Sequence, residues 1–299
     1  MATTKRLAGV IPALLTPLKE NGNIDFALVE EQVHYLAAAG VHGFFVNGST
    51  GEGPYLTTQE KLEVFKVVKN VSQGQQFLCA ACLQPSTSLV LEELKAFEPL
   101  EPDYIVAVTP YYYSVSQEVI KAHYYNIARN TEIPVIIYNI PSTVHHAIQL
   151  DTLLDLAASG EFAGMKDSSG DFVTFSRAIY QQAWPEFSWI QGEDLLDGQS
   201  CAVGSDGLVT GLGNVWIDPY MTLFRHKQEG RLDFLNEDQK TINQLFELIR
   251  VTGGKVGPAI KAATTLLGRS HKWMKLSELT LRDDEIAKVK QVLEHLDLL

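Results

Sequence analysis

The sequence lacks basic clusters and long apolar runs. Its 299 residues include 24 Lys and Arg against 36 Asp and Glu, a formal net charge of −12, which argues against nucleic acid or an anionic membrane surface as a partner. No apolar run approaches the roughly 20 residues of a membrane-spanning helix. Pro12 interrupts the apolar start of the chain, and no small-residue cleavage site follows. We therefore expect a cytoplasmic protein that does not bind membranes.

Cysteine is scarce, with three residues in the chain. Cys79 and Cys82 have the C-x-x-C spacing of redox sites, but that motif works at a helix amino terminus. Here it lies inside the apolar, strand-like run 77–82. Residues three apart on a strand face opposite sides, so the two sulfurs cannot bridge or share a metal. We expect both to be buried core residues.

Metal and phosphate motifs are missing as well. The chain has no H-x-x-E-H motif, no paired acidic cluster and no phosphate-binding loop. His145 and His146 are adjacent and would face opposite sides of a strand. The sequence therefore predicts no metal site.

What the chain does contain is a regular alternation of short apolar runs and amphipathic segments. Helices begin after capping residues such as Asp25, Thr57 and Ser86, and Thr57 forms a capping box with Glu60. Continuous apolar strands that alternate with helices are typical of a parallel sheet buried on both faces. Eight of them favour a closed (β/α)8 TIM barrel, of the α/β class, over an open doubly wound sheet. The predicted strands cover 9–15, 43–47, 77–82, 103–109, 134–139, 162–166, 187–191 and 207–210.

The alternation stops after Thr210. We expect a barrel with the active site over residues 1–225 and a C-terminal helical extension over 226–299. Because no low-complexity linker separates the two, the helical region should pack on the barrel. The helices predicted after Thr210 cover 218–227, 234–251, 258–267 and 284–299.

One predicted strand ends in a lysine. Chemistry in a TIM barrel lies at the carboxyl ends of the strands, and Lys166 closes the run 162–166 just before two serines and a glycine. An amine that burial keeps partly neutral is a nucleophile able to form a Schiff base with a ketone. On this spacing alone a solvated strand-end lysine is the commoner case. The other strand ends contribute further hydroxyls, tyrosines and glycines to the same face.

Four of these strand ends carry motifs of one known family: GSTGE at 48–52, TPYY at 109–112, YNIP at 138–141 and GMKD at 164–167. With them the chain resembles the dihydrodipicolinate synthase/N-acetylneuraminate lyase family of pyruvate-dependent class I aldolases. The resemblance implies a lyase that forms a covalent lysine–pyruvate imine and needs no metal or cofactor. Its partners would be pyruvate or another 2-keto acid and an aldehyde.

The resemblance also implies catalytic roles. Lys166 would form the imine, and Tyr138 would act as general acid and base. Tyr112, inserted from a neighbouring subunit, would complete a proton relay with Ser49 and Tyr138. The protein would then be a homo-oligomer, a dimer or a homotetramer built as a dimer of dimers. Without the resemblance, a core tyrosine and surface aromatic packing would explain the two tyrosines.

The same resemblance implies how the substrate carboxylate is held. Hydroxyls and backbone N–H groups of Ser49 and Thr50 would bind it, and Gly48 would let the backbone approach, in the manner of an anion-binding nest. Read by itself, the stretch is an ordinary Gly-Ser turn.

The chain departs from two members of the family at substrate-contacting positions. Thr143 stands where dihydrodipicolinate synthases carry an arginine for the carboxylate of the aldehyde. Leu195 and Gly211 stand where sialic acid lyases carry an acid and a serine. We therefore expect reversible cleavage of a 2-keto-3-deoxy sugar acid to pyruvate and an aldehyde. The residues expected to bind the polyol are Thr143, Asp167, Ser168 and Asp194, and Thr210 is also expected to contact the substrate.

Three alternatives stay open. The enzyme could be a 4-hydroxy-tetrahydrodipicolinate synthase that joins pyruvate to aspartate semialdehyde, or an N-acetylneuraminate lyase. From a different class, it could be a non-catalytic paralogue that binds a 2-keto acid. The presence of Lys166, Tyr138 and Ser49 argues against the last, because a binding protein has no use for a proton relay.

Overall fold

The computed structural model describes residues 6–181 and 184–299. Its centre is a sheet of eight parallel strands in the order β1-β8-β7-β6-β5-β4-β3-β2. Contacts between β1 and β2 close the ring, with Leu14 N donating to Phe45 O at 3.0 Å. The (β/α)8 barrel predicted from the sequence is confirmed. The strands are β1 (Gly9–Pro12), β2 (Gly43–Val46), β3 (Phe77–Cys82), β4 (Tyr104–Val108), β5 (Val135–Asn139), β6 (Gly164–Asp167), β7 (Ser188–Gln191) and β8 (Gly207–Thr210).

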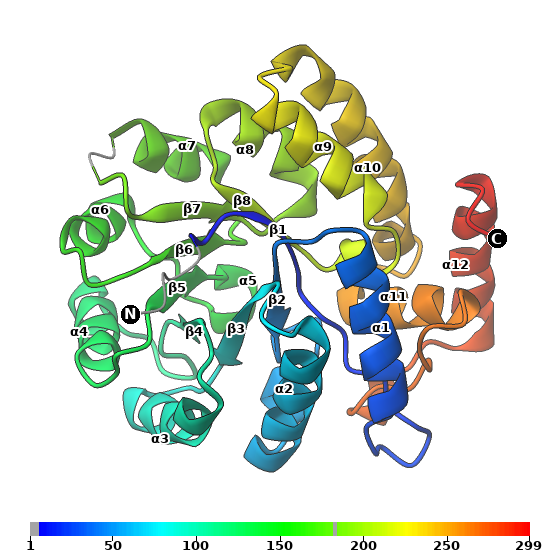
Figure 1. The fold of residues 1–299 in the computed structure, drawn as a ribbon, viewed down its shortest axis with the longest axis horizontal. Coiled ribbons are helices and arrows are strands. Elements are labelled where there is room, and N and C mark those ends of the chain that lie inside the picture. Colours follow the sequence, from blue (N-terminus) through cyan, green and yellow to red (C-terminus); the bar gives the residue numbers. More distant parts are fainter. Residues whose placement is uncertain (1–5, 182–183) are drawn as a thin grey trace.

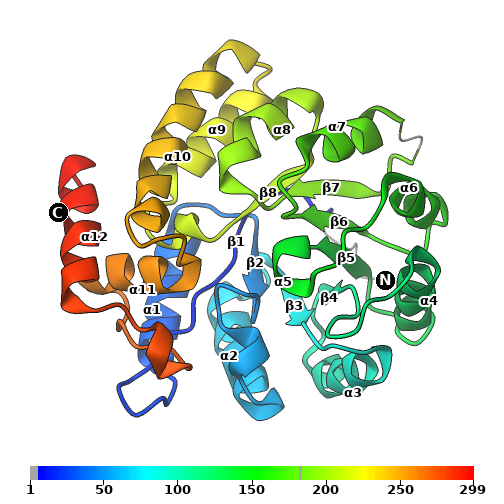
Figure 2. The ribbon, with the colours of Figure 1, turned by 180° about the vertical axis from the view of Figure 1, so that it is seen from behind.

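Helices surround these strands, as Figures 1 and 2 show from opposite sides. Short 3₁₀ turns interrupt the loops at Gly53–Tyr55, Glu98–Leu100, Asp194–Leu196, Leu212–Asn214, Leu232–Phe234 and Ser277–Leu279. The helices of the barrel region are α1 (Phe26–Ala38), α2 (Thr58–Ser72), α3 (Thr87–Phe97), α4 (Gln117–Ala128), α5 (Pro141–Val144), α6 (Leu150–Ala158), α7 (Phe172–Gln181) and α8 (Asp197–Val203). Four more follow: α9 (Asp218–Gln228), α10 (Leu235–Arg250), α11 (Val256–Leu266) and α12 (Asp283–His295).

Six of the eight predicted strands differ from the observed strands at one or both ends, and two of them differ by more than one residue at an end. In the run 9–15, β1 ends at Pro12, although Ala13 N still donates to Thr210 O and Leu14 N to Phe45 O. Leu15 N then donates to the side chain of Asn214, at 3.1 Å, instead of to a neighbouring strand. Strand β6 begins at Gly164 and continues past Lys166 to Asp167, whose carbonyl accepts from Gly192 N at 2.7 Å. Lys166 is therefore the penultimate residue of its strand.

Helix caps follow the sequence in part. Thr57 and Glu60 form the predicted capping box of α2, with Thr57 N donating to Glu60 Oε2 at 2.8 Å. Asp25 and Ser86 occupy the N-cap positions of α1 and α3, but neither side chain accepts a capping hydrogen bond. Asp25 Oδ2 instead lies 3.1 Å from His271 Nε2, so this side chain links the start of α1 to the C-terminal region.

Two apolar layers form the core. One fills the barrel and includes Phe45, Cys79 and Tyr138, whereas the other packs between the strands and the surrounding helices and includes Cys82. Both cysteines are buried and free. The prediction that they point to opposite faces of their strand is confirmed.

The last helices lie along one side of the barrel. Helix α9 contacts α8 and β1, and α10 packs against α8, α9 and the turn at Asp194–Leu196. Helices α11 and α12 contact α10 and each other, and in Figure 1 α12 lies at the outer edge of the molecule. The predicted division of the chain at residue 225 runs through α9 and stays a prediction. Within the described residues, no helix is long and apolar enough to cross a membrane.

Candidate active site

Lys166 reaches into the barrel between two aromatic rings. Its Nζ lies 4.1 Å from the ring centroid of Tyr138 and 4.3 Å from that of Phe45. Tyr138 is its register partner on β5, and only 6% of Lys166 is exposed. Neither a hydrogen bond nor an ion pair occupies the amine in the described part of the chain. The aromatic faces replace water around the nitrogen, while leaving it free to react.

Lys166 lines a cavity of about 300 Å³. The cavity gathers seven of the residues singled out from the sequence: Ser49, Thr50, Tyr138, Thr143, Lys166, Ser168 and Asp194. Its far wall comes from the C-terminal region, through Phe246 and Ile249 of α10 and Val256 and Gly257 of α11. Sequence reasoning missed this wall, since nothing local marks these apolar side chains as facing the lysine.

The turn that carries Ser49 and Thr50 is held rigidly. Gly53 N donates to Gly48 O at 3.0 Å, and Thr16 Oγ1 donates to Gly51 O at 2.8 Å. A Cβ at Gly48 would lie 2.6 Å from the Phe45 ring, so glycine lets this turn pack over the ring beside Lys166. The backbone N–H groups of Thr50 and Gly51 donate no hydrogen bond among the described residues. They are free to bind an anion.

Glu52 anchors the same turn to the C-terminal region. Its carboxylate forms a buried ion pair with Lys261 of α11 and accepts from Lys275 N at 2.8 Å. Lys261 Nζ also donates to Trp273 O at 2.8 Å. Sequence reasoning missed this pair, because its members are 209 residues apart.

Asp167 and Asn139 join the ends of β6 and β5. Asn139 Nδ2 donates to Asp167 Oδ1 at 2.7 Å, and Ser169 Oγ donates to Oδ2 at 2.8 Å. Burial raises the pKa of Asp167 to about 6. Its carboxylate lies outside the cavity lining, so the expectation that Asp167 binds a polyol is not supported by its position. The pair instead braces the two strands that carry Lys166 and Tyr138.

Asp194 lines the cavity but is already engaged. Its Oδ1 accepts from Thr210 Oγ1 at 2.5 Å and from the Tyr220 hydroxyl at 2.6 Å. Burial raises its pKa, and these hydrogen bonds offset part of the rise. Thr210 is fully buried behind Asp194, and Tyr220 of α9 is a partner that sequence reasoning missed. Direct contact of Thr210 with substrate, expected from the sequence, has no support in this arrangement.

Tyr112 lies away from the cavity of its own chain. It is 85% exposed, its backbone is left-handed at φ 82°, and its ring packs against Tyr113 at a centroid distance of 5.0 Å. Tyr111 turns inward, with its hydroxyl donating to Leu83 O at 3.2 Å. An exposed aromatic side chain on a bent tip is available to another molecule.

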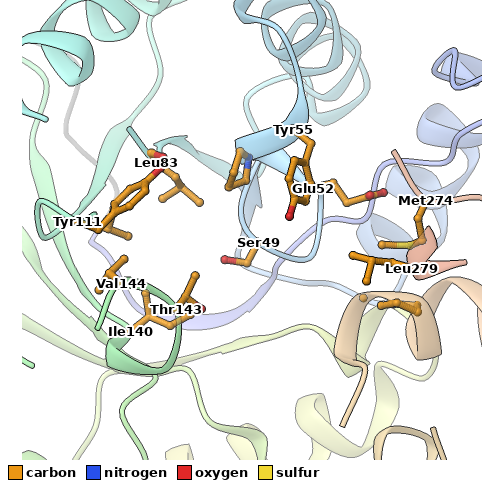
Figure 3. Close-up of a pocket in the computed structure, with 14 residues that line it drawn as sticks. Ser49, Glu52, Tyr55, Leu83, Tyr111, Ile140, Thr143, Val144, Met274 and Leu279 are labelled. Atoms are coloured by element: carbon orange, nitrogen blue, oxygen red, sulfur yellow. Dashed lines mark hydrogen bonds between the residues drawn. The ribbon is translucent and has the colours of Figure 1, made fainter. Parts of the chain in front are cut away.

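A second cavity, of about 480 Å³, adjoins the first and shares Ser49, Ile140, Thr143 and Gly257 with it. Figure 3 shows Ser49 between apolar side chains from the barrel loops and from the C-terminal region. The apolar groups include Leu83, Val144, Met274 and Leu279. The reactive end of the barrel therefore opens from a small cavity that contains the Lys166 amine into a larger cavity with a more apolar lining.

Comparison with known proteins agrees with this geometry. The family model described as the dihydrodipicolinate synthetase family matches residues 6–296. A curated 4-hydroxy-tetrahydrodipicolinate synthase from Bdellovibrio bacteriovorus is 31% identical over 264 residues, which are 88% of this chain and 89% of that protein. A crystal structure of dihydrodipicolinate synthase from Thermotoga maritima is 26% identical, with a TM-score of 0.93 over 99% of this chain and 100% of its own.

A second solved structure is CdNal from Clostridium difficile in complex with mannosamine. It is 25% identical, with a TM-score of 0.89 over 97% of this chain and 99% of its own. The family match spans nearly the whole sequence and includes both the barrel and the last helices. The chain belongs to the dihydrodipicolinate synthetase family and is a lyase of the class I aldolase type.

Proposed function

We propose that this enzyme reversibly cleaves a 2-keto-3-deoxy sugar acid to pyruvate and an aldehyde through an imine on Lys166. The observation that carries the proposal is the Lys166 amine, held over Tyr138 in a cavity lined otherwise by hydroxyls, carboxylates and apolar groups. A buried amine without a carboxylate partner is suited to attack a ketone.

The residues allow a balanced sequence of steps. Lys166 Nζ attacks the C2 carbonyl of the substrate, and loss of water leaves a protonated imine. Tyr138 removes the proton of the C4 hydroxyl, the C3–C4 bond breaks, and its electron pair moves into the imine to form an enamine. The aldehyde leaves. Return of the proton to C3 and hydrolysis of the imine release pyruvate and restore the amine.

The turn at 48–52 supports binding of the C1 carboxylate. Ser49 and Thr50 of this turn line the cavity and carry hydroxyls, and the N–H of Thr50 donates no hydrogen bond among the described residues. Neutral donors of this kind hold a carboxylate without adding a second fixed cation beside the lysine. Ser49 would also pass the proton between Tyr138 and solvent or a neighbouring subunit. No direct hydrogen bond joins Ser49 to Tyr138 in the described part of the chain.

The cavity lining supports a polyol as the second part of the substrate. Lys166 is its only lysine or arginine among the described residues, so a second carboxylate would find no fixed cation there. Ser142, Thr143 and Ser168 add hydroxyls instead. The runner-up is 4-hydroxy-tetrahydrodipicolinate synthase, which the names of curated relatives favour and which Thr143 disfavours.

We also propose that the enzyme is a homo-oligomer in which Tyr112 completes the site of a neighbouring copy. The exposed, left-handed Tyr112 supports this, because it does not reach its own cavity. Mixing Tyr112→Ala with Lys166→Met subunits tests it. Each variant alone should be inactive, and re-formed mixed oligomers should recover part of the activity. No recovery, in oligomers shown to contain both variants, would contradict the proposal. The cytoplasmic location and the absence of a cofactor stay predictions.

Borohydride reduction in the presence of pyruvate tests the central step. A reduced pyruvyl group should appear on the peptide that contains Lys166, and Lys166→Met should abolish it. Label on another lysine, such as Lys255, would overturn the mechanism. Pyruvate that binds but cannot be trapped would favour the non-catalytic paralogue instead.

A further inference from the structure

We infer that Glu193 selects the substrate: its carboxylate accepts hydrogen bonds from adjacent hydroxyls on the part of the 2-keto acid that leaves as the aldehyde. The inference rests on the proposed function and deepens it. Glu193 follows β7 directly after Gly192, and both residues line the Lys166 cavity.

The backbone of Glu193 is fixed from beneath. The buried Gln191 side chain accepts from Gly192 N and from Glu193 N, each at 2.9 Å, and donates to Ser200 Oγ at 2.7 Å. Gly192 N also donates to Asp167 O at 2.7 Å, which ties this turn to the strand that carries the lysine. Glu193 therefore has a defined position relative to the reacting centre.

The Glu193 carboxylate is nonetheless not engaged by any described side chain. It forms no ion pair, and its polar contact is with the backbone N–H of Leu195, two residues further along, although the side chain is half-buried. Its neighbour Asp194 differs, because Thr210 and Tyr220 already hold an oxygen of that carboxylate. Burial and the nearby Asp194 both raise the pKa of Glu193, and the N–H of Leu195 offsets part of the rise. Of the two acids in the cavity wall, Glu193 is the one whose carboxylate no other described side chain occupies.

The rest of the lining identifies the donor as a hydroxyl. A carboxylate at this place repels an anionic aldehyde, and Lys166, which the reaction converts to an imine, is the only cationic side chain in the described lining. Ser142 and Thr143 face the same cavity with hydroxyls that no other described side chain engages. The Ser142 and Thr143 hydroxyls can both donate and accept hydrogen bonds, whereas the Glu193 carboxylate only accepts them. A diol on the substrate also donates and accepts, but an ammonium group can only donate. Vicinal hydroxyls therefore satisfy all three side chains.

Two 2-keto acids that differ only in this region test the inference. One is 2-keto-3-deoxygluconate, and the other is 4-hydroxy-2-oxopentanoate, which lacks the distal hydroxyls. Glu193→Ala should lower kcat/KM for the sugar acid by about ten- to a hundredfold, the effect of one charge-assisted hydrogen bond. It should change the truncated substrate by less than about threefold. Glu193→Gln should lie between, because an amide oxygen still accepts but carries no charge.

Glu186 provides the matched control. It is an exposed glutamate that precedes β7, at the opposite end of the strand from Glu193. Glu186→Ala and Glu186→Gln should leave both substrates unaffected. Equal losses for the two substrates in Glu193→Ala would overturn the inference while leaving the proposed function standing. If the wild type releases pyruvate from neither substrate, the proposed function fails, and the inference fails with it. Faster turnover by Glu193→Ala of the sugar acid would also overturn the inference.

Discussion

A Cβ atom at Gly192 would lie 2.7 Å from Cε of Lys166 and 2.4 Å from Oγ of Ser168. The reactive side chain therefore occupies space that is open only because residue 192 is glycine. The backbone at Gly192 is not left-handed, so alanine is excluded by contact and not by conformation.

Gly192→Ala is expected to displace Lys166 and to slow trapping of pyruvate by borohydride at least about tenfold, since small misplacements of a reacting group are costly. Gly257→Ala is the control. Gly257 lines the same cavity, but a Cβ there would meet only Met274 Cε, at an ordinary 3.4 Å. Equal trapping rates in the two variants would show that Gly192 does not set the position of the lysine.

Tyr138→Phe should leave the imine trappable while turnover falls by about two to four orders of magnitude, the usual contribution of a general acid or base. Phenylalanine keeps the ring beside Lys166 and the edge-to-face contact with Phe45 at 5.8 Å, so only the hydroxyl is lost. Tyr124→Phe removes a buried hydroxyl that donates to Tyr138 O at 3.4 Å and serves as the control. Near-normal turnover in Tyr138→Phe would remove this residue from the mechanism.

Thr143 should decide between neutral and anionic aldehydes. We expect kcat/KM for a 2-keto-3-deoxy sugar acid to exceed that for pyruvate plus aspartate semialdehyde by at least about tenfold, because a charge-assisted contact is missing. Thr143→Arg, in the cavity wall, should narrow this ratio. Coupled assays of both substrate sets with both proteins measure it. Efficient condensation of aspartate semialdehyde by the wild type would show that the substrate assignment is wrong.

The buried pair of Glu52 and Lys261 should control pyruvate binding through the 48–52 turn. Lys261→Met leaves a buried carboxylate unpaired, so we expect a loss of about 3–5 kcal/mol in the free energy of unfolding and a higher KM for pyruvate. Adding Glu52→Gln to Lys261→Met should restore part of the lost stability and lower the KM for pyruvate again.

A second buried pair provides the comparison. Lys61 and Glu93, 2.5 Å apart, link α2 to α3 outside the cavity lining. Lys61→Met should destabilise the protein to a similar extent while KM for pyruvate stays within about twofold. If KM for pyruvate rose equally in Lys61→Met and Lys261→Met, the rise would reflect lost stability alone and not a role of the Glu52–Lys261 pair in binding.

Asp167 should make stability depend on pH. Its pKa is raised from 3.8 to about 6 by burial, so between these values the folded protein binds a proton that the unfolded chain releases. Stability from this group therefore falls as pH rises from about 4 to 6, by at most about 3 kcal/mol. Asp167→Asn should gain stability relative to wild type at pH 8 compared with pH 4. Urea unfolding at both pH values measures this difference, and a constant offset would contradict it.

Some of the site could be predicted because it depends on neighbours in sequence. Alternation of apolar strands and capped helices is a local property, so all eight strands were predicted, β3 and β8 with the observed bounds. Strand ends meet at one face of a barrel, so the sequence alone predicts that Lys166 and Tyr138 lie close together. The same period of two places Asp167 on the opposite face from Lys166, a consequence that the sequence already contained.

Only the tertiary structure decided which side chains complete the cavity and which are already occupied. Helix α10 brings Phe246 and Ile249 into the wall of the cavity that contains Lys166, and α11 brings Lys261 to Glu52, although no local pattern links residues so distant in sequence. The sequence likewise does not show which of the two carboxylates, Asp194 or Glu193, is already hydrogen-bonded by other side chains. Both are acids at the end of β7, yet Thr210 and Tyr220 engage only Asp194. Periodicity determines the direction of a side chain, whereas its partners depend on how distant elements pack.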